Sequence, residues 1–208
     1  MALHPKSRFI EMFGSIRNNS HDYKVGNLED YIIFLTSGSR GWSKYFSNHG
    51  EIFITIKNVK NTLVSQENIQ YVIPPENQEA KRTKVQEGDL LISITADLGR
   101  TGVVPKDIAV QGAYINQHLS LVRLDRSFLN PRYVAFFLET DEGKEQFQRQ
   151  NKSSVKAGLN FNDIKHLKIL IPPKSAQDEF VNYVEVIDKS KLAEPQDKYF
   201  WWEILTLL

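Results

Sequence analysis

Asp97 and Arg100 could do chemistry together, because both stand in one short polar segment between two extended stretches. An arginine fork can donate two parallel hydrogen bonds to guanine or phosphate, and an aspartate can accept one from the amino group of cytosine. The apolar run at residues 90–94 has the length of a buried strand, and residues 101–104 lead into a second one. The pattern predicts a strand–turn–strand unit whose loop faces a base edge or phosphate, or else an ordinary hairpin with two solvated charges.

Other polar loops carry similar side chains. Asparagine and glutamine can pair with adenine, and lysine can reach guanine or phosphate. The residues that we expect to contact bases are Arg40, Asn58, Asp97, Arg100, Asn116, Gln117 and His118, with Trp42 as a stacking surface. The residues that we expect to contact phosphates are Lys57, Lys60, Arg82, Lys84, Lys152 and Lys156. The alternatives are structural, with Trp42 packed at the edge of the core, Asn58 in a hairpin and the cations on a solvated face.

The composition limits these interpretations. The 208 residues are 41% hydrophobic and 25% charged, and the net charge is +1. That balance neither indicates nor excludes a nucleic-acid partner, because local clusters of charge set the binding field. The absence of cysteine excludes disulfides and thiolate metal sites, and the five histidines form no metal-binding motif. Without a signal-peptide core or an apolar run of 18 residues, we expect a cytoplasmic protein with no membrane span.

The periodicity of apolar residues predicts both strands and helices. Strands are expected at residues 51–56, 69–73, 90–94, 118–124 and 167–171, with a strand or helical turn at 28–35. Helices are expected at 6–13, 131–138, 141–150 and from residue 175 onward, with helical turns at 76–81 and 160–164. Asn130 and Pro131 are typical of a helix start, and Gly14 is typical of a helix end. Residues 109–112 are expected to be extended.

No catalytic motif is present. The sequence lacks the glycine-rich cofactor loop and the Asn/Asp-Pro-Pro-aromatic pocket of a DNA methyltransferase, and it lacks Walker and nucleophile-elbow motifs. Asp141, Glu142 and Lys144 could form a metal-dependent nuclease site, although a charged helix face is the simpler interpretation. We therefore predict a binding function, with no catalytic residue, no metal and no cofactor.

Four segments, in this order and spacing, resemble a target recognition domain of the type I restriction–modification DNA specificity subunit, HsdS. Residues 6–14 resemble the end of the family's central conserved helix, and residues 23–30 with the Ser-Gly pair at 37–38 resemble the opening of the domain. Residues 87–93 followed by 99–102 resemble its hallmark strand–turn–strand. Residues 167–173, with Gln177 and Phe180, resemble the strand, proline stop and helix that close it.

The resemblance implies an α+β fold with a mixed, largely antiparallel twisted sheet and flanking helices. Residues 1–22 would be the end of a conserved helix and a linker, 23–173 the target recognition domain, and 174–208 the start of a conserved helix with an atypical apolar tail. The implied function is non-catalytic. Such a domain reads one half of a split target in double-stranded DNA and positions modification methyltransferase subunits and the restriction subunit. S-adenosylmethionine and ATP would be bound by those partners.

The chain departs from the family pattern, because a full subunit normally carries two recognition domains. We expect either the second half of a subunit or a half-subunit that forms a homodimer. Apolar residues of the first and last helices are the expected subunit interface: Phe9, Ile10, Phe13, Phe180, Val184 and Ile187. The first helix could instead pack on the rest of the chain. Pro195 and the apolar residues 199–208 leave an alternative open, a protein-interaction scaffold or a truncated remnant that no longer reads DNA.

Overall fold

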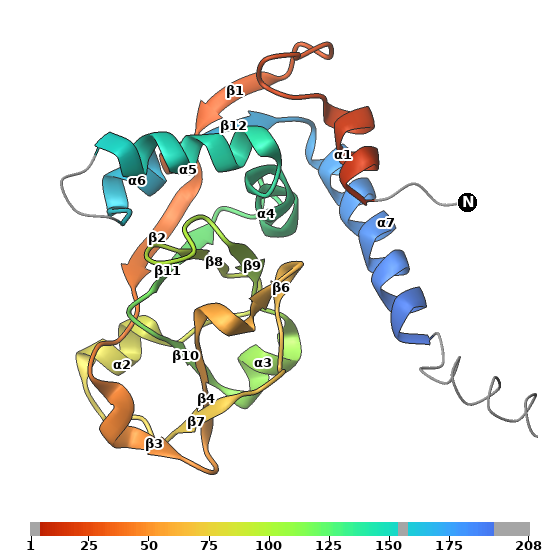
Figure 1. The fold of residues 1–208 in the computed structure, drawn as a ribbon. Coiled ribbons are helices and arrows are strands. Elements are labelled where there is room, and N and C mark those ends of the chain that lie inside the picture. Colours follow the sequence, from red (N-terminus) through yellow and green to blue (C-terminus); the bar gives the residue numbers. More distant parts are fainter. Residues whose placement is uncertain (1–4, 154–157, 194–208) are drawn as a thin grey trace, which may run out of the picture.

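Helices gather at one end of the molecule and a small sheet forms the other end, with the largest sheet between them (Figure 1). The structure is a computed structural model that describes residues 5–153 and 158–193. The helices at the first end are α1 (Pro5–Phe13), α4 (Pro131–Leu138), α5 (Asp141–Ser153), α6 (Phe161–Lys165) and α7 (Lys174–Ala193). A two-stranded antiparallel ribbon, formed by β1 (Lys24–Asn27) and β12 (Lys168–Ile171), lies among these helices.

The central sheet has six strands in the order β2-β11-β8-β9-β6-β5. Its neighbours are antiparallel except for β6 and β9, which are parallel. The strands are β2 (Ile32–Ser37), β5 (Val59–Lys60), β6 (Thr62–Val64), β8 (Leu90–Ser93), β9 (Thr101–Val103) and β11 (Leu119–Leu124).

The second sheet has the order β10-β4-β7-β3, with a parallel pair between β10 and β4. Its strands are β3 (Phe46–Ser47), β4 (Glu51–Ile54), β7 (Gln70–Val72) and β10 (Ala113–Ile115). Short helices complete the described part: η1 (Leu28–Tyr31), η2 (Trp42–Tyr45), η3 (Ile56–Asn58), α2 (Gln78–Thr83) and α3 (Lys106–Gln111). The arrangement confirms an α+β fold with mixed, mostly antiparallel sheets and flanking helices.

The first three residues of strand β8 are all apolar because both faces of the strand are covered. Successive side chains of a strand point to opposite faces. Leu90 and Ile92 enter the cluster that also holds Tyr133 of α4, while Leu91 enters the cluster formed with Ile54 of the second sheet. A strand buried on both faces reads as a continuous apolar run rather than an alternation.

Helix α1 is held by tertiary packing, since nine residues are too few for an isolated helix to be stable. The rings of Phe9 and Phe13 lie 5.4 and 4.9 Å from the ring of Tyr133, and 5.1 and 5.7 Å from that of Phe180. Gly14 ends the helix at φ +67°, as predicted.

This packing corrects the expected subunit interface. Phe9, Phe13, Phe180 and Val184 are buried in the chain's own core, so they are not available to a second subunit. Ile10 is half exposed, and Ile187 is partly exposed.

Two segments differ from their predictions. Residues 109–112 are not extended: Ala109 and Val110 lie in helix α3, which begins after Pro105 and ends at Gly112 with φ +87°. Residues 113–115, where no strand was expected, form strand β10 because they pair with β4. The pairing with β4 overrides the local pattern at β10, and buried Ile108 packs α3 into the cluster that also contains Ile54.

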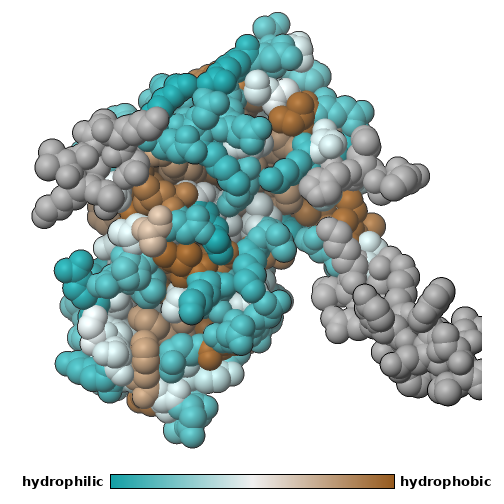
Figure 2. Space-filling view, in the orientation of Figure 1, coloured by the Kyte–Doolittle hydropathy of each residue, from teal (hydrophilic) through white to brown (hydrophobic). Residues whose placement is uncertain are grey.

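The face drawn in Figure 2 is largely hydrophilic and carries scattered apolar patches. The large apolar side chains most exposed in the described part are Val110, Val186, Ile33 and Phe128. Within residues 5–153 and 158–193, no helix combines the length and apolarity needed to cross a membrane.

Candidate nucleic-acid interface

The β8–β9 loop is tied together across its base. The Ser93 hydroxyl donates to the Asp97 carbonyl oxygen and accepts from the Arg100 amide at 2.8 Å, while the Gly99 amide donates to the Ser93 carbonyl at 3.0 Å. The Arg100 guanidinium pairs with the Asp97 carboxylate and donates to the Val59 carbonyl at 3.4 Å. The loop predicted from sequence is therefore present, but its two charged residues bind each other.

Packing explains why glycine stands at positions 99 and 102. A Cβ atom at Gly99 would lie 2.6 Å from Cγ of Phe147 on α5, and φ at Gly99 is +75°. A Cβ at Gly102 would lie 2.8 Å from the carbonyl oxygen of Leu63. The two glycines thus let helix α5 and strand β6 pack closely against the backbone of this segment.

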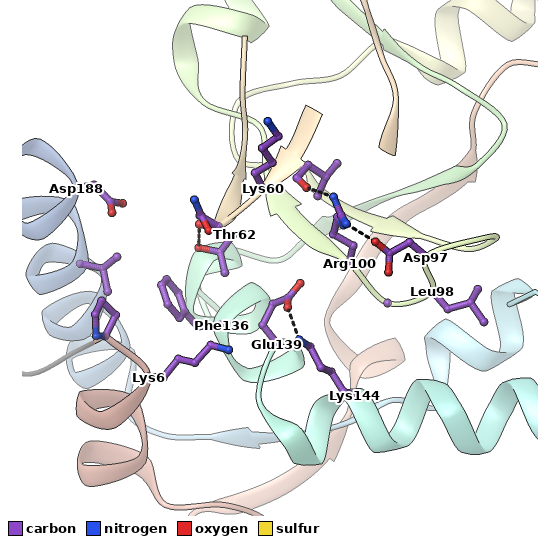
Figure 3. Close-up of a pocket in the computed structure, with 15 residues that line it drawn as sticks. Lys6, Lys60, Thr62, Asp97, Leu98, Arg100, Phe136, Glu139, Lys144 and Asp188 are labelled. Atoms are coloured by element: carbon purple, nitrogen blue, oxygen red, sulfur yellow. Dashed lines mark hydrogen bonds and ion pairs between the residues drawn. The ribbon is translucent and has the colours of Figure 1, made fainter. Parts of the chain in front are cut away.

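A groove runs between the terminal helices and the hairpin of β5 and β6 (Figure 3). Its volume is about 630 Å³. Its lining cations include three with carboxylate partners: Lys60 with Glu67 at 2.6 Å, Lys144 with Glu139 at 3.2 Å, and Arg100 with Asp97. These carboxylates offset the charge of the three side chains, which weakens the attraction of the three side chains for phosphates.

A second polar cluster joins three loops by hydrogen bonds. Arg40 Nε, in the β2–η2 loop, donates to Gln117 Oε1 at 2.8 Å. Gln117 Nε2 lies 3.3 Å from His118 Nε2, and His118 Nδ1 lies 2.6 Å from Thr95 Oγ1 in the β8–β9 loop. Asn116 Oδ1 accepts from the His118 amide at 3.2 Å. The structure thus brings together four residues that the sequence predicted as base contacts, and adds Thr95.

The loop that carries Arg40 is fixed from both sides. Ser39 is buried, and its hydroxyl lies 3.0 Å from that of Thr83 on α2. Trp42 is only 3% exposed; its Nε1 donates to Glu79 at 2.8 Å and its ring stacks on Phe53 at 5.8 Å. Trp42 therefore packs in the core, and the expectation that it stacks on a base is wrong, because a stacking surface must be exposed.

Asn58 is fully engaged inside the protein. Its Oδ1 accepts from the amide and the hydroxyl of Thr55, both at 3.0 Å, and its Nδ2 donates to the Glu67 carbonyl at 3.0 Å. The residue is 2% exposed. Asn58 caps the short helix η3, so the expectation that it contacts a base is corrected in favour of the structural alternative.

Two expected phosphate contacts also have internal partners. Arg82 Nη1 donates to Thr36 Oγ1 at 2.6 Å and to the Ser37 carbonyl at 2.5 Å. Lys84 pairs with Glu51 at 2.7 Å, and this bond raises the pKa of the Lys84 ammonium group. Both side chains remain partly exposed, so they contribute charge to the surface while they stabilise the fold.

The remaining expected phosphate contacts lie on exposed segments or outside the described residues. Lys57 is exposed and has no ion-pair partner within the described ranges. Lys152 lies on α5, where its side chain is not described, and Lys156 lies outside the described residues. Residues 158 and 159, the first described after the gap, lie beside the β8–β9 loop. The Leu159 amide donates to the Ile94 carbonyl at 2.9 Å.

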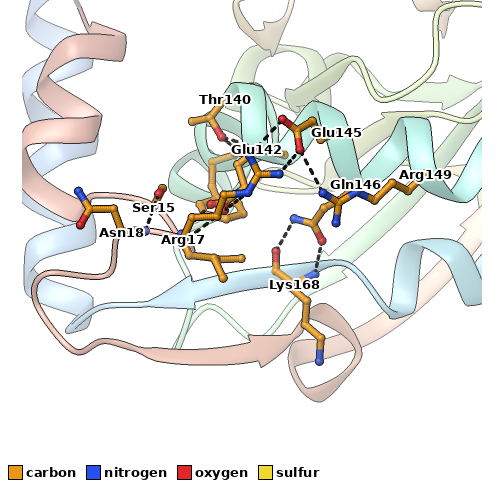
Figure 4. Close-up of polar contacts among 12 residues, drawn as sticks. Ser15, Arg17, Asn18, Thr140, Glu142, Glu145, Gln146, Arg149 and Lys168 are labelled. Atoms are coloured by element: carbon orange, nitrogen blue, oxygen red, sulfur yellow. Dashed lines mark hydrogen bonds and ion pairs between the residues drawn. The ribbon is translucent and has the colours of Figure 1, made fainter.

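The acidic start of α5 anchors the linker that follows α1 (Figure 4). Glu142 accepts from the Ile16 amide at 2.6 Å and from the Arg17 amide at 3.1 Å. Glu145 pairs with the Arg17 guanidinium, and this hydrogen bond lowers the pKa of Glu145. The part of the chain that the structure describes holds no cluster of three metal-binding side chains. Glu142 thus anchors the linker, and Lys144 pairs with Glu139 at 3.2 Å.

The chain is similar to known proteins along most of its length. The family model described as "Type I restriction modification DNA specificity domain" matches residues 21–197. The type I restriction enzyme EcoBI specificity subunit of Escherichia coli is 27% identical over 105 residues, which are 50% of this chain and 22% of that protein.

Solved structures share the fold. The HsdS subunit from Thermoanaerobacter tengcongensis gives a TM-score of 0.60 at 18% identity, over 93% of this chain and 44% of that one. A chain from the structure describing complex assembly and conformational transition of the type I R-M system gives 0.64 at 15% identity, over 98% and 48%. This chain therefore spans less than half the length of these relatives. Since the family model covers well over half of its residues, the chain belongs to the type I restriction modification DNA specificity domain family.

Proposed function

We propose that this chain reads one half of a split target in double-stranded DNA and positions the modification methyltransferase and restriction subunits of a type I restriction–modification system. The match of the family model to residues 21–197 carries the proposal. The cluster of Arg40, Asn116, Gln117 and His118 supports it, because arginine and amide side chains on neighbouring loops are suited to contacting base edges in the major groove.

The share of its relatives that the chain spans supports a half-site reader. It covers 44% and 48% of two solved relatives, which fits one of two recognition domains. A two-fold pair of such chains would supply two readers, related by the same symmetry as the two halves of the target. The domain boundaries 1–22, 23–173 and 174–208 are part of this proposal.

The specificity subunits of this family are non-catalytic, and the partner subunits bind the cofactors of the complex. We accordingly propose that S-adenosylmethionine and ATP are used only by the modification and restriction subunits. Within this chain, Lys57, Lys152 and Lys156 would contact phosphates, with Lys60, Arg82 and Lys84 adding positive charge nearby. The Asp97–Arg100 pair would face the DNA beside them.

Selection from a random pool of DNA duplexes tests the proposal. The purified 208-residue chain would be used alone and with a modification subunit. We expect enrichment of a motif of a few base pairs, and a doubled motif with a fixed gap if two chains pair. Absence of enrichment in both conditions would refute DNA reading and favour the scaffold or remnant alternative.

A further inference from the structure

The arginines of the described residues differ in what compensates their charge. Seven have a carboxylate within ion-pair distance: Arg8, Arg17, Arg82, Arg100, Arg123, Arg132 and Arg149. The guanidinium groups of the other two, Arg40 and Arg126, have no carboxylate partner within the described ranges, although the Arg40 backbone amide donates to Glu79 Oε1 at 3.5 Å. A carboxylate partner offsets the positive charge of an arginine and occupies part of its fork, whereas an arginine without such a partner keeps its full charge for an external acceptor. An arginine in this state can contact an external ligand if its position also directs its fork toward that ligand.

Of these two, Arg40 is also held in place by a side-chain hydrogen bond within the described part of the chain. Its Nε donates to the neutral Oε1 of Gln117 at 2.8 Å. The two Nη groups then remain at the outer end of the guanidinium, with no partner among the residues that the structure describes. Two parallel N–H donors of this kind match the O6 and N7 acceptors of guanine.

The partner of Arg40 is itself oriented by a chain of hydrogen bonds. Because Gln117 Oε1 accepts from Arg40, the Gln117 amide nitrogen is the atom that faces His118 Nε2, at 3.3 Å. His118 Nε2 then accepts, so its proton lies on Nδ1, which donates to Thr95 Oγ1 at 2.6 Å. This chain fixes the orientation of the Gln117 amide and so fixes the direction of the Arg40 side chain.

The backbone beneath Arg40 is fixed as well. Ser39 and Trp42 on either side of it are buried. A Cβ atom at Gly38 would collide with the carbonyl oxygen of Asn116, so the two loops touch through their backbones. A side chain that is already ordered loses less conformational entropy on binding, which favours a specific contact over an adaptable one.

We propose that Arg40 recognises a guanine in the DNA half-site and that Gln117 and His118 are positioning residues that aim its fork. The inference rests on the proposed DNA-reading function and assigns one residue to one kind of base. It also separates roles among the base-contact residues expected from sequence: Arg40 reads the base, while Gln117 and His118 hold it in position.

The test is equilibrium binding to the selected duplex and to duplexes in which each guanine of the motif is replaced in turn. The full chain is used, with the modification subunit if binding requires it. Arg40→Ala should lower discrimination at one guanine by roughly 5- to 150-fold and leave the other positions unchanged. Gln117→Ala should weaken discrimination at the same guanine by a smaller factor, because Arg40 keeps its fork but loses its orientation.

Two further variants serve as controls. Arg126→Ala removes the other arginine without a carboxylate partner, which lies beside Gly88 at the opposite end of β8, and should leave discrimination unchanged. Arg40→Lys keeps the charge and can still reach guanine but lacks the planar fork, so it should retain most of the affinity while its guanine discrimination falls less than in Arg40→Ala. This variant also separates loss of reading from loss of folding.

The possible outcomes distinguish the inference from the proposed function. A motif without guanine, or unchanged discrimination in Arg40→Ala, would overturn the role of Arg40 while DNA reading stands. An equal loss of affinity for all duplexes would show that Arg40 binds phosphate, which also overturns it. If the unmodified chain shows no sequence preference, the proposed function fails and the inference fails with it.

Discussion

Replacing Gly99 with alanine should destabilise the domain more than the same change at Gly41. Both glycines have positive φ angles, +75° and +69°, so alanine costs roughly 1–2 kcal/mol of backbone strain at either position. At Gly41 a Cβ atom has nothing within 4 Å, whereas at Gly99 it meets the Phe147 ring. Overpacking typically adds about 1–3 kcal/mol. The free energy of unfolding should fall by about 2–5 kcal/mol for Gly99→Ala and by about 1–2 kcal/mol for Gly41→Ala.

Urea unfolding of the full chain measures both values, since a shifted midpoint with an unchanged slope reports a change in stability. A double variant, Gly99→Ala with Phe147→Leu, isolates the clash. The smaller side chain should make room for the methyl group, so the pair should lose less stability than the sum of the single changes. If Gly99→Ala is no more destabilising than Gly41→Ala, contact with Phe147 is not the reason that glycine is required at position 99.

Three further variants test the internal roles assigned above. Asn58→Ala should lower the free energy of unfolding by about 1–3 kcal/mol, because a buried side chain with three hydrogen bonds is lost; an unchanged urea midpoint would contradict this. Glu142→Ala removes the acceptor for the Ile16 and Arg17 amides, so hydrogen exchange should accelerate at both residues, and equal rates would disprove the anchor. Arg17→Met should raise the pKa of Glu145 toward its ordinary value of 4.5, because the hydrogen bond from Arg17 is the largest cause of its lowering; carboxyl NMR titration measures it. Since the folded-state pKa is lowered, the pair stabilises the fold above the unfolded-state pKa, and this stabilisation is lost as pH falls through the folded-state value. Arg17→Met should therefore reduce the loss of stability in acid, below about pH 4.5.

Several elements could be predicted because their signals are local. The apolar run at 90–94 indicated a buried strand, and β8 lies between two apolar clusters. Asn130 indicated a helix start, and its side chain accepts from the Arg132 amide at 3.0 Å. Helix caps and buried strands are recognisable in sequence because the responsible residues stand within a few positions of one another.

Distant contacts decide the elements that the sequence did not reveal. Strand β10 forms because β4 offers it a parallel partner, and such pairing leaves no local periodicity in three residues. From sequence, residues 109–112 resemble an extended segment. In the structure, Ala109 and Val110 belong to helix α3, and Gly112 follows its last residue.

In the candidate site, the sequence shows which residue types could bind DNA but not which of their side chains the fold leaves exposed. The sequence reveals that Asn58, Trp42 and Arg40 are capable of contacting DNA, but not which of them the fold engages internally. Trp42 donates a hydrogen bond to Glu79, and Asn58 donates one to the Glu67 carbonyl. No sequence motif links either residue to its partner. Thr95 was missed for the same reason, because a lone threonine in a turn carries no signal until the fold places His118 beside it.

Amide hydrogen exchange of the full chain, with and without a duplex that carries the selected half-site, tests the central claim most directly. Binding through the three polar loops predicts slower exchange at residues 38–41, 94–100 and 116–118, and unchanged exchange at the edge strand β3. A mixed-sequence duplex at the same concentration should give weaker protection. Protection confined to α1 and α7, with the three loops unaffected, would contradict the claim that these loops face the DNA.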